Sequence, residues 1–179
     1  ISTKDDIVPF ELEQQPDITF YRNAGKTKRQ GLELSGGYLL GKNVNLSASY
    51  TFSDFTYEDF STPNGDFAGN ILPGIPRHFG TISLQSTENE GFIYNIQARL
   101  IGKLYAADDN QITDDGYSLV NVQIGYAFQT ESGLIKPFLG VNNLFDVDYN
   151  DNVRINAFGG RHFEAGPPLH LFGGVKVRW

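Results

Sequence analysis

From residue 169 to the C-terminal Trp179, apolar and polar side chains alternate with a period of two. The odd positions of this segment are apolar or glycine, whereas the even positions include His170, Lys176 and Arg178. Because successive side chains of a β-strand point to opposite faces, the segment is predicted to be a strand with one apolar and one polar face. Helical periodicity is almost absent from the chain, so we expect an all-β fold.

The same alternation recurs upstream, between segments rich in turn-forming residues. It predicts eight strands in total, at residues 6–12, 31–40, 43–55, 77–86, 92–105, 117–130, 135–149 and 169–179. The connections between them differ in length. We expect short turns at residues 40–43, 87–91 and 130–133, and long polar loops at residues 13–26, 56–76, 106–116 and 150–168. This arrangement is typical of outer-membrane barrels, which carry short turns on one side and long loops on the other.

The predicted strands also have a suitable length for crossing a membrane. About ten residues at roughly 3.3 Å each, tilted by about 45°, span on the order of 23 Å. Aromatic side chains gather near the strand ends, where Tyr and Trp prefer the boundary between lipid and water. Those near the short turns are Tyr38, Phe92, Tyr94, Tyr126, Phe128 and Trp179, and those near the long loops are Phe10, Phe52, Phe145 and Tyr149. We therefore predict an antiparallel transmembrane β-barrel. A soluble β-sandwich, whose core uses the same alternation, is the alternative class.

Composition excludes several other classes of protein. A net charge of −7 argues against a nucleic-acid partner, and the absence of Cys excludes disulfides and thiolate chemistry. No run of 18 apolar residues is present that could form a transmembrane helix. The mean hydropathy of −0.31 is the value expected when an apolar face and a polar face are averaged. The absence of Met and of a signal peptide indicates a processed or truncated part of a larger protein.

Six motifs, in order along nearly the whole chain, resemble the C-terminal third of TonB-dependent outer-membrane receptors. They are residues 6–10 (DIVPF), residues 23–25 with 31–34 (NAG and GLEL), residues 49–51 (SYT), residues 72–78 (LPGIPRH), residues 141–146 with Tyr149 (VNNLFD), and residues 154–161 (RINAFGGR). The ending Val175, Val177, Trp179 resembles the C-terminal signal by which outer-membrane barrels are recognised for insertion, although this family usually ends in Phe. The resemblance implies that residues 1–179 form about eight C-terminal strands of a 22-stranded barrel. It also implies a plug domain and a TonB box, both absent from this chain.

What this resemblance implies for function is uptake of a scarce nutrient at the bacterial outer membrane. The ligand is most often a ferric siderophore, and cobalamin, haem, copper or oligosaccharide remain open. The partners would be the TonB energy-transducing complex, the ligand, and the lipid and lipopolysaccharide of the outer membrane. We expect the protein to have no enzymatic activity and no cofactor. The alternative function is a stand-alone eight-stranded barrel that acts as a structural or adhesion protein or as a passive pore.

Cationic residues near the predicted loops are the candidates for ligand binding, because ferric siderophores are often anionic and Arg donates two hydrogen bonds to such oxygens. They are Arg77, His78, Arg154, Arg161 and His162, and the pair Arg154 and Arg161, around a Gly-Gly sequence, is the strongest. We assign no catalytic residue and no metal ligand. Asp108, Asp109, Asp114 and Asp115 could imitate an acid–base set or bind Ca²⁺, but their spacing favours solvated acidic loops. Asn142 is expected to face the lumen, whereas the pattern does not explain Asn143 on the apolar face.

Overall fold

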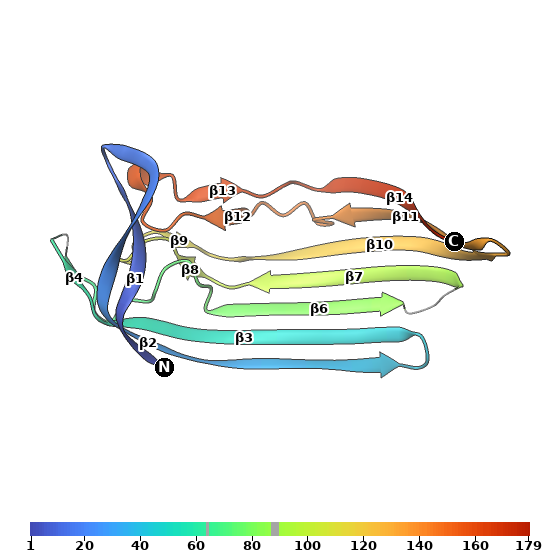
Figure 1. Ribbon diagram of the computed structural model, residues 1–179, viewed down its shortest axis with the longest axis horizontal. Helices are drawn as coiled ribbons and strands as arrows, with labels where there is room; N and C mark the ends of the chain where they lie inside the picture. The colour runs from blue at the N-terminus through green and yellow to red at the C-terminus, as the bar shows by residue number, and fades with distance from the viewer. Residues whose placement is uncertain (64, 87–89) are drawn as a thin grey trace.

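The computed structural model describes residues 1–63, 65–86 and 90–179, and nearly all of its regular structure is β. Its main element is an eight-stranded antiparallel sheet with the order β1-β2-β3-β6-β7-β10-β11-β14, which follows the order of the chain (Figure 1). The bounds are β1 (Ser2–Leu12), β2 (Gln15–Leu40), β3 (Val44–Asp59), β6 (His78–Ser86), β7 (Gly91–Ile101), β10 (Tyr117–Thr130), β11 (Gly133–Asn142) and β14 (His170–Arg178). The prediction of an all-β chain with eight antiparallel strands is confirmed. β1 and β14 are the edges of the sheet, so it is an open part of a barrel wall.

The long connections lie together at one end of the sheet, and the turns at residues 41–43 and 131–132 lie at the other end (Figure 1). The connections contain small hairpins and one 3₁₀ turn: β4 (Ser61–Thr62) with β5 (Gly65–Asp66), β8 (Leu104–Tyr105) with β9 (Thr113–Asp114), β12 (Asn150–Val153) with β13 (Phe163–Ala165), and η1 (Phe158–Gly160). The predicted turn at residues 87–91 lies mostly outside the described residues. In the part of the chain that the structure describes, no helix is long and apolar enough to span a bilayer.

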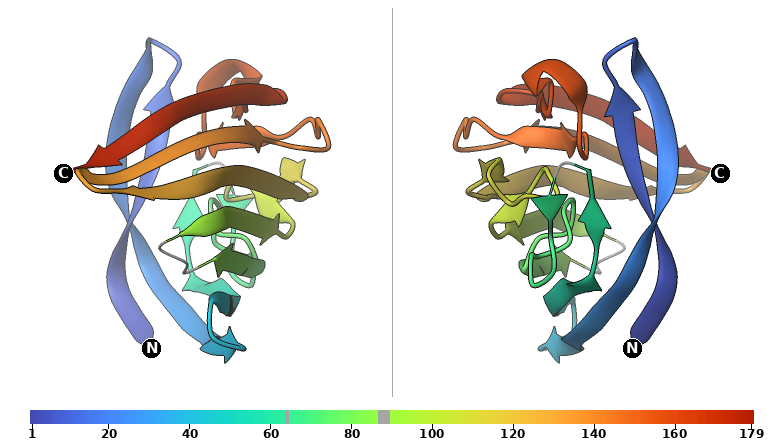
Figure 2. Two further views of the ribbon diagram at one scale, coloured as in Figure 1. Left: turned by 90° about the vertical axis from the view of Figure 1, so that its right-hand side faces the viewer. Right: turned by 90° about the vertical axis from the view of Figure 1, so that its left-hand side faces the viewer.

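The expected long loop at residues 13–26 is wrong, because these residues belong to a hairpin. β1 and β2 pair from Ser2↔Lys28 to Leu12↔Gln15, with only two residues between the strands. The hairpin projects beyond the rest of the sheet (Figure 2, blue). A strand that extends beyond the part of the barrel in contact with lipid needs no apolar face. Its sequence therefore lacks the alternation of apolar and polar residues on which the prediction depended.

The strand register aligns the alternating side chains into rows across the sheet. One row of paired residues on the apolar face runs through seven strands: Tyr38, Leu46, Leu84, Ile96, Val122, Val141 and Leu171. The adjacent row, on the opposite face, contains Asn45, Gln85, Asn95 and Gln123. No second layer covers the apolar row in the described residues, and Leu171 is 79% exposed. A β-sandwich would bury this face, so the sheet has the pattern of a wall between lipid and water.

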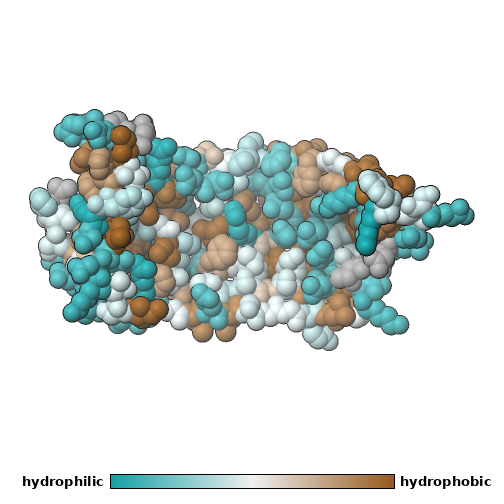
Figure 3. Space-filling view, in the orientation of Figure 1, coloured by the Kyte–Doolittle hydropathy of each residue, from teal (hydrophilic) through white to brown (hydrophobic). Residues whose placement is uncertain are grey.

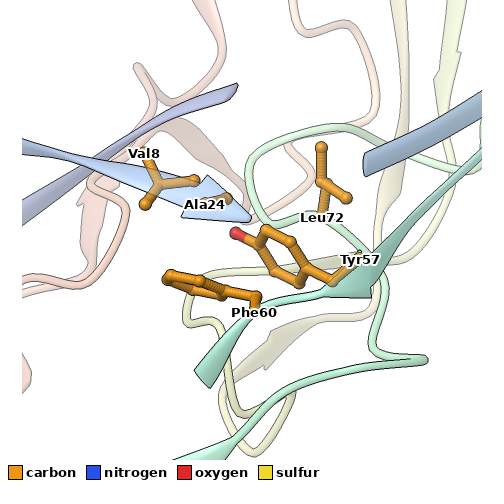
Figure 4. Packing of buried hydrophobic residues seen from close by; sticks show 5 residues of the cluster. All are labelled: Val8, Ala24, Tyr57, Phe60 and Leu72. Carbon is orange, nitrogen blue, oxygen red and sulfur yellow. The ribbon is translucent and has the colours of Figure 1, made fainter. Parts of the chain in front are cut away.

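The largest buried cluster lies at the loop end rather than in the middle of the sheet. Val8 and Ala24 of the β1–β2 hairpin pack with Tyr57 of β3 and with Phe60 and Leu72 of the following connection (Figure 4). Hydrophilic residues are dense over the same end of the molecule (Figure 3, left). The loops therefore fold around a small apolar core of their own.

Candidate ligand-binding region

Asp108 lies at the centre of the loop cluster and is only 3% exposed. Its Oδ1 accepts a hydrogen bond from the Tyr57 hydroxyl (2.7 Å), and its Oδ2 accepts one from Arg22 Nη2 (3.1 Å). Its backbone carbonyl accepts a bond from Asn70 Nδ2 (2.8 Å), and its backbone N–H donates to Asn156 Oδ1 (3.0 Å). One residue thereby joins the β1–β2 hairpin, β3 and three connections.

Aromatic rings enclose the groups that bind Asp108. The Tyr57 ring centroid lies 4.7 Å from that of Phe60, and the Arg22 guanidinium lies over the rings of Phe10 (5.0 Å) and Phe60 (5.2 Å). Burial, followed by the charge of Asp108, raises the pKa of the Tyr57 hydroxyl far above its ordinary value, so Tyr57 remains a neutral donor. This part of the loop cluster is a preorganised polar network inside an apolar shell.

The expectation that the acidic loop residues are all solvated is wrong for Asp108 and Asp114. Asp114 is 9% exposed; its Oδ1 accepts a bond from the Gly116 N–H (2.7 Å) and its Oδ2 one from Asn150 Nδ2 (2.5 Å). Both carboxylates therefore hold loops in place. Among residues 1–63, 65–86 and 90–179, no group of three or more His, Asp or Glu is arranged to hold a metal ion.

Two cavities lie on the polar face of the sheet, below the loops. The first, of about 460 Å³, extends from Ser83, Gln97 and Asn121 to Asn143, Tyr149 and Pro167. The second, of about 530 Å³, lies between Phe79, Ile101 and Tyr117 of the sheet and residues 150–153 of β12. Arg99 lines both, and its Nη2 is 3.8 Å from Asp151 Oδ1. Cavities of this size accommodate small organic ligands.

Two of the predicted ligand-binding residues, Arg77 and His78, lie beside aromatic residues of the apolar face. Arg77 Nη2 is 2.8 Å from Asp54 Oδ1, and its guanidinium lies 5.9 Å from the Phe52 ring. His78 Nδ1 is 2.8 Å from the Tyr50 hydroxyl, and the two rings are stacked. This position lies on the side of the sheet opposite the two cavities, so it does not favour contact with a ligand in either of them.

The other three predicted residues, Arg154, Arg161 and His162, come together on the segment that joins β12 to β13. Arg154 Nε lies 2.8 Å from Glu164 Oε1, and Arg161 is exposed next to η1. His162 is 4% exposed, and its Nδ1 lies 3.2 Å from the Arg154 carbonyl oxygen. The buried His162 ring therefore helps to hold the backbone of Arg154 in position. Hydrogen bonds from Asn152 and then Arg154 lower the pKa of the Glu164 carboxyl, so this ion pair persists at neutral pH.

Comparison with known proteins identifies the family. Residues 1–144 match the family described as "TonB dependent receptor-like, beta-barrel". The chain belongs to this family. It is 28% identical over 134 residues to the ferrioxamine receptor of Yersinia enterocolitica, a match that covers 73% of this chain and 18% of the relative. It is 26% identical over 145 residues to the ferrichrome outer membrane transporter/phage receptor of Escherichia coli (strain K12), covering 77% of this chain and 19% of the relative. The chain thus spans about a fifth of the length of these relatives.

A solved structure of the same kind supports the fold. The ferric yersiniabactin uptake receptor of Yersinia pestis superimposes with a TM-score of 0.71 over 97% of this chain and 25% of that receptor. Its sequence identity to this chain is 20%, so the likeness concerns the fold alone. The eight strands therefore form a segment of a TonB-dependent receptor barrel.

Asn143 explains where the last loop of this barrel segment begins. It has a positive φ of 50°, and it is 3% exposed. Its Oδ1 accepts the Val147 N–H (2.9 Å), and its Nδ2 donates to the carbonyls of Val147 (2.9 Å) and Pro167 (3.3 Å). The strand predicted at residues 135–149 therefore ends at Asn142. Asn tolerates the left-handed conformation better than most residues, so the Asn-Asn sequence was the available signal.

Asn142 lies on the polar face of the sheet, and the C-terminal ending lies on the apolar face. Asn142 lines the first cavity, and its Nδ2 is 2.9 Å from His170 Nε2. Val175 and Val177 pair with Pro137 and Ile135 on the apolar face, and Trp179 is 95% exposed at the chain end. Recognition of Val175, Val177 and Trp179 as an insertion signal stays a prediction.

Proposed function

We propose that the protein to which these residues belong is an outer-membrane receptor that takes up a ferric siderophore by TonB-dependent active transport. The observation that carries this proposal is membership of the TonB-dependent receptor family, with relatives named for ferrioxamine and ferrichrome. The aligned apolar rows support it, because they provide a lipid-facing surface across the strands. The function is therefore that of a receptor and transporter rather than an enzyme.

In this proposal the polar face lines the barrel lumen and the loop cluster lies outside the cell. The ligand enters at the loop end, where Arg154 and Arg161 are carried on one hairpin and Arg99 lies between two cavities. Guanidinium groups suit anionic chelates because each offers several fixed hydrogen-bond donors. The Asp108 network holds the loops in a binding-competent arrangement, which lowers the entropy lost when ligand binds.

The energy for transport would come from outside this segment. The family resemblance implies a plug domain in the lumen and a TonB box that engages the TonB complex, and both belong to other parts of the receptor. Lipid and lipopolysaccharide of the outer membrane would contact the apolar face and its loop-side edge, where Arg77, His78 and Tyr50 lie.

The test is iron uptake by the full-length receptor. Cells that lack their own siderophore receptors would express it and receive ⁵⁵Fe bound to a hydroxamate, a catecholate or citrate, with and without a functional TonB complex. We expect TonB-dependent accumulation with at least one chelate. Uptake that is indifferent to TonB would instead support a passive pore, and transport of a nutrient without iron would overturn the siderophore assignment.

A further inference from the structure

Residues 154–162 form a loop whose two ends are held together. The Arg154 N–H donates to the His162 carbonyl oxygen (2.8 Å), and the His162 Nδ1 lies 3.2 Å from the Arg154 carbonyl oxygen. Arg161 follows the tip of this loop, where the two preceding glycines have positive φ values of 71° and 75°. A Cβ at either glycine would meet no atom of the described residues within 4 Å. The position of Arg161 therefore depends on how the base of the loop is held.

Asn156 fastens the base of this loop to the β1–β2 hairpin and to the connection between β8 and β9. Its Nδ2 donates to the Pro9 carbonyl oxygen (2.8 Å), although the two residues are 147 positions apart in the chain. Its backbone N–H donates to the Ala106 carbonyl oxygen (2.9 Å), and its Oδ1 accepts the Asp108 N–H (3.0 Å). The hairpin and the β12–β13 segment lie at the same end of the molecule (Figure 1). The backbone N–H and both polar atoms of the Asn156 side chain therefore bond outside the loop itself.

The neighbours of Asn156 keep it in this position. Its φ of 53° lies in the left-handed region, which Asn tolerates better than most residues. Ile155 occupies the space beside Gly74, where a Cβ would lie 2.5 Å from Ile155 Cδ1. The Phe158 N–H donates to Glu11 Oε2 (3.1 Å), which adds a second bond to the same hairpin. The base of the loop is therefore shaped so that the Asn156 amide meets the hairpin.

We propose that Asn156 is a positioning residue for ligand binding: it holds the loop that carries Arg161 against the β1–β2 hairpin, so that the guanidinium is in place for an anionic ferric chelate. Without the Asn156 side chain, residues 155–161 would be free to shift relative to the hairpin. A loop that is already fixed loses less conformational entropy when one of its side chains engages a ligand. The inference rests on the proposed function, because it concerns how Arg161 meets the proposed ligand.

Two substitutions of Asn156 separate its side-chain bonds. Asn156→Asp keeps an acceptor for the Asp108 N–H but replaces the donor to Pro9 with a carboxylate oxygen, whereas Asn156→Gly keeps the positive φ and removes both bonds. In hydrogen exchange of the ligand-free full-length receptor, we expect faster exchange at Phe158 in both variants and at Asp108 in Asn156→Gly alone. Asn23→Asp adds the same charge at an exposed position of the hairpin and should match the wild type. Unchanged exchange at Phe158 in Asn156→Asp would overturn the proposal.

Ligand binding provides the second measurement, with ferric citrate and a ferric tris-catecholate as the anionic probes. Fluorescence quenching titrations should give a Kd about fivefold higher for Asn156→Asp than for the wild type, the change that corresponds to one lost hydrogen bond. A residue that only stabilises the fold would raise the Kd by the same factor whether or not Arg161 is present. We therefore expect a factor close to one when Asn156→Asp is added to Arg161→Gln. An equal factor in both backgrounds would overturn the proposal.

The two measurements also separate this inference from the proposed function. Asn23→Asp should leave the Kd for both probes at the wild-type value, which excludes a general effect of the added charge. A wild-type receptor that binds neither probe would overturn the proposed anionic ligand and, with it, the role of Arg161. Wild-type binding that Asn156→Asp leaves unchanged would overturn the positioning role alone.

Discussion

The Tyr57 hydroxyl donates a 2.7 Å hydrogen bond to Asp108 Oδ1, although the two residues are 51 positions apart in the chain. Both side chains are buried, and the same carboxylate accepts a bond from Arg22 of the β1–β2 hairpin. The bond lies where a strand of the barrel wall meets loops that originate from different strands. We infer that Asp108 sets the relative positions of these loops.

Asp108→Ala is expected to loosen the loop cluster and leave the sheet intact. The substitution leaves the Tyr57 hydroxyl and the Arg22 guanidinium without their buried acceptor, which should cost about 2–4 kcal/mol of local stability. Amide hydrogen exchange of the folded receptor should show faster exchange at Asn70 and Leu72, whose N–H groups bond within the cluster.

Tyr57→Phe serves as the milder comparison for the same network. It removes one donor and keeps the ring on Phe60, so we expect a loss of about 1 kcal/mol. If Tyr57 and Asp108 act through their mutual bond, the double variant Tyr57→Phe, Asp108→Ala should lose less than the two single losses combined. Strict additivity would contradict the proposed coupling.

The apolar-faced parts of the strands could be predicted from the sequence, whereas the β1–β2 hairpin and the loop network could not, for a physical reason. The apolar face must match lipid along its whole height, so residues such as Leu46, Ile96 and Val122 impose a period of two that is visible locally. Asp108 has the same local pattern as any solvated acidic loop residue. Its hydrogen-bond partners lie 38–86 positions away in the chain, and the sequence near residue 108 contains no signal that predicts which residues they are.

Asn143 shows a second place where the alternation of apolar and polar residues fails to predict the structure. Alternation continues through residue 149, but the positive φ of Asn143 turns the chain out of the strand. We expect Asn143→Ala to destabilise the 143–149 segment by about 2–3 kcal/mol, because it combines left-handed strain with the loss of three side-chain hydrogen bonds. Asn143→Gly loses the same side-chain hydrogen bonds but adopts the positive φ without strain, so its loss of stability should be smaller. Thermal unfolding and hydrogen exchange at Val147 measure the difference, and equal losses would exclude a conformational contribution.

The backbone conformation and close surroundings of residue 116 require glycine, and Gly36 is the matched control. Gly116 has a φ of 83°, and a Cβ there would lie 2.2 Å from the Ile101 carbonyl oxygen. A Cβ at Gly36 would meet no atom within 4 Å. We expect Gly116→Ala to lower the thermal stability of the folded receptor clearly and Gly36→Ala to leave it within about 0.5 kcal/mol of wild type. A larger effect at Gly36 would show that this position packs against something beyond these residues.

Ligand binding should depend on the β12–β13 segment more than on the apolar-face pair. Arg161→Gln removes an exposed guanidinium, and we expect the Kd for an anionic ferric chelate to rise by about tenfold if one charge-assisted bond is lost. Arg77→Gln is the matched control, because Arg77 lies beside Phe52 on the apolar face of the sheet. The Kd of this variant for the same chelate should equal that of the wild type. Fluorescence quenching titrations of the purified receptor give both values. A stronger effect at Arg77 would move the binding surface to the loop-side edge of the apolar face.

Trp179 tests whether the C-terminal ending directs assembly. Val175 and Val177 lie on the apolar face of β14, and Trp179 directly follows the strand. Trp179 is almost fully exposed, so it adds little packing within the described residues. If the ending is an insertion signal, Trp179→Ala should reduce the amount of folded receptor in the outer membrane much more than it lowers the unfolding temperature of the receptor that does assemble. Trp179→Phe should restore assembly because it keeps the terminal aromatic ring. Arg178→Gln, one position away on the polar face, is the control. Heat-dependent gel mobility of membrane fractions measures the folded amount, and a Trp179→Ala receptor that assembles normally would remove the signal assignment.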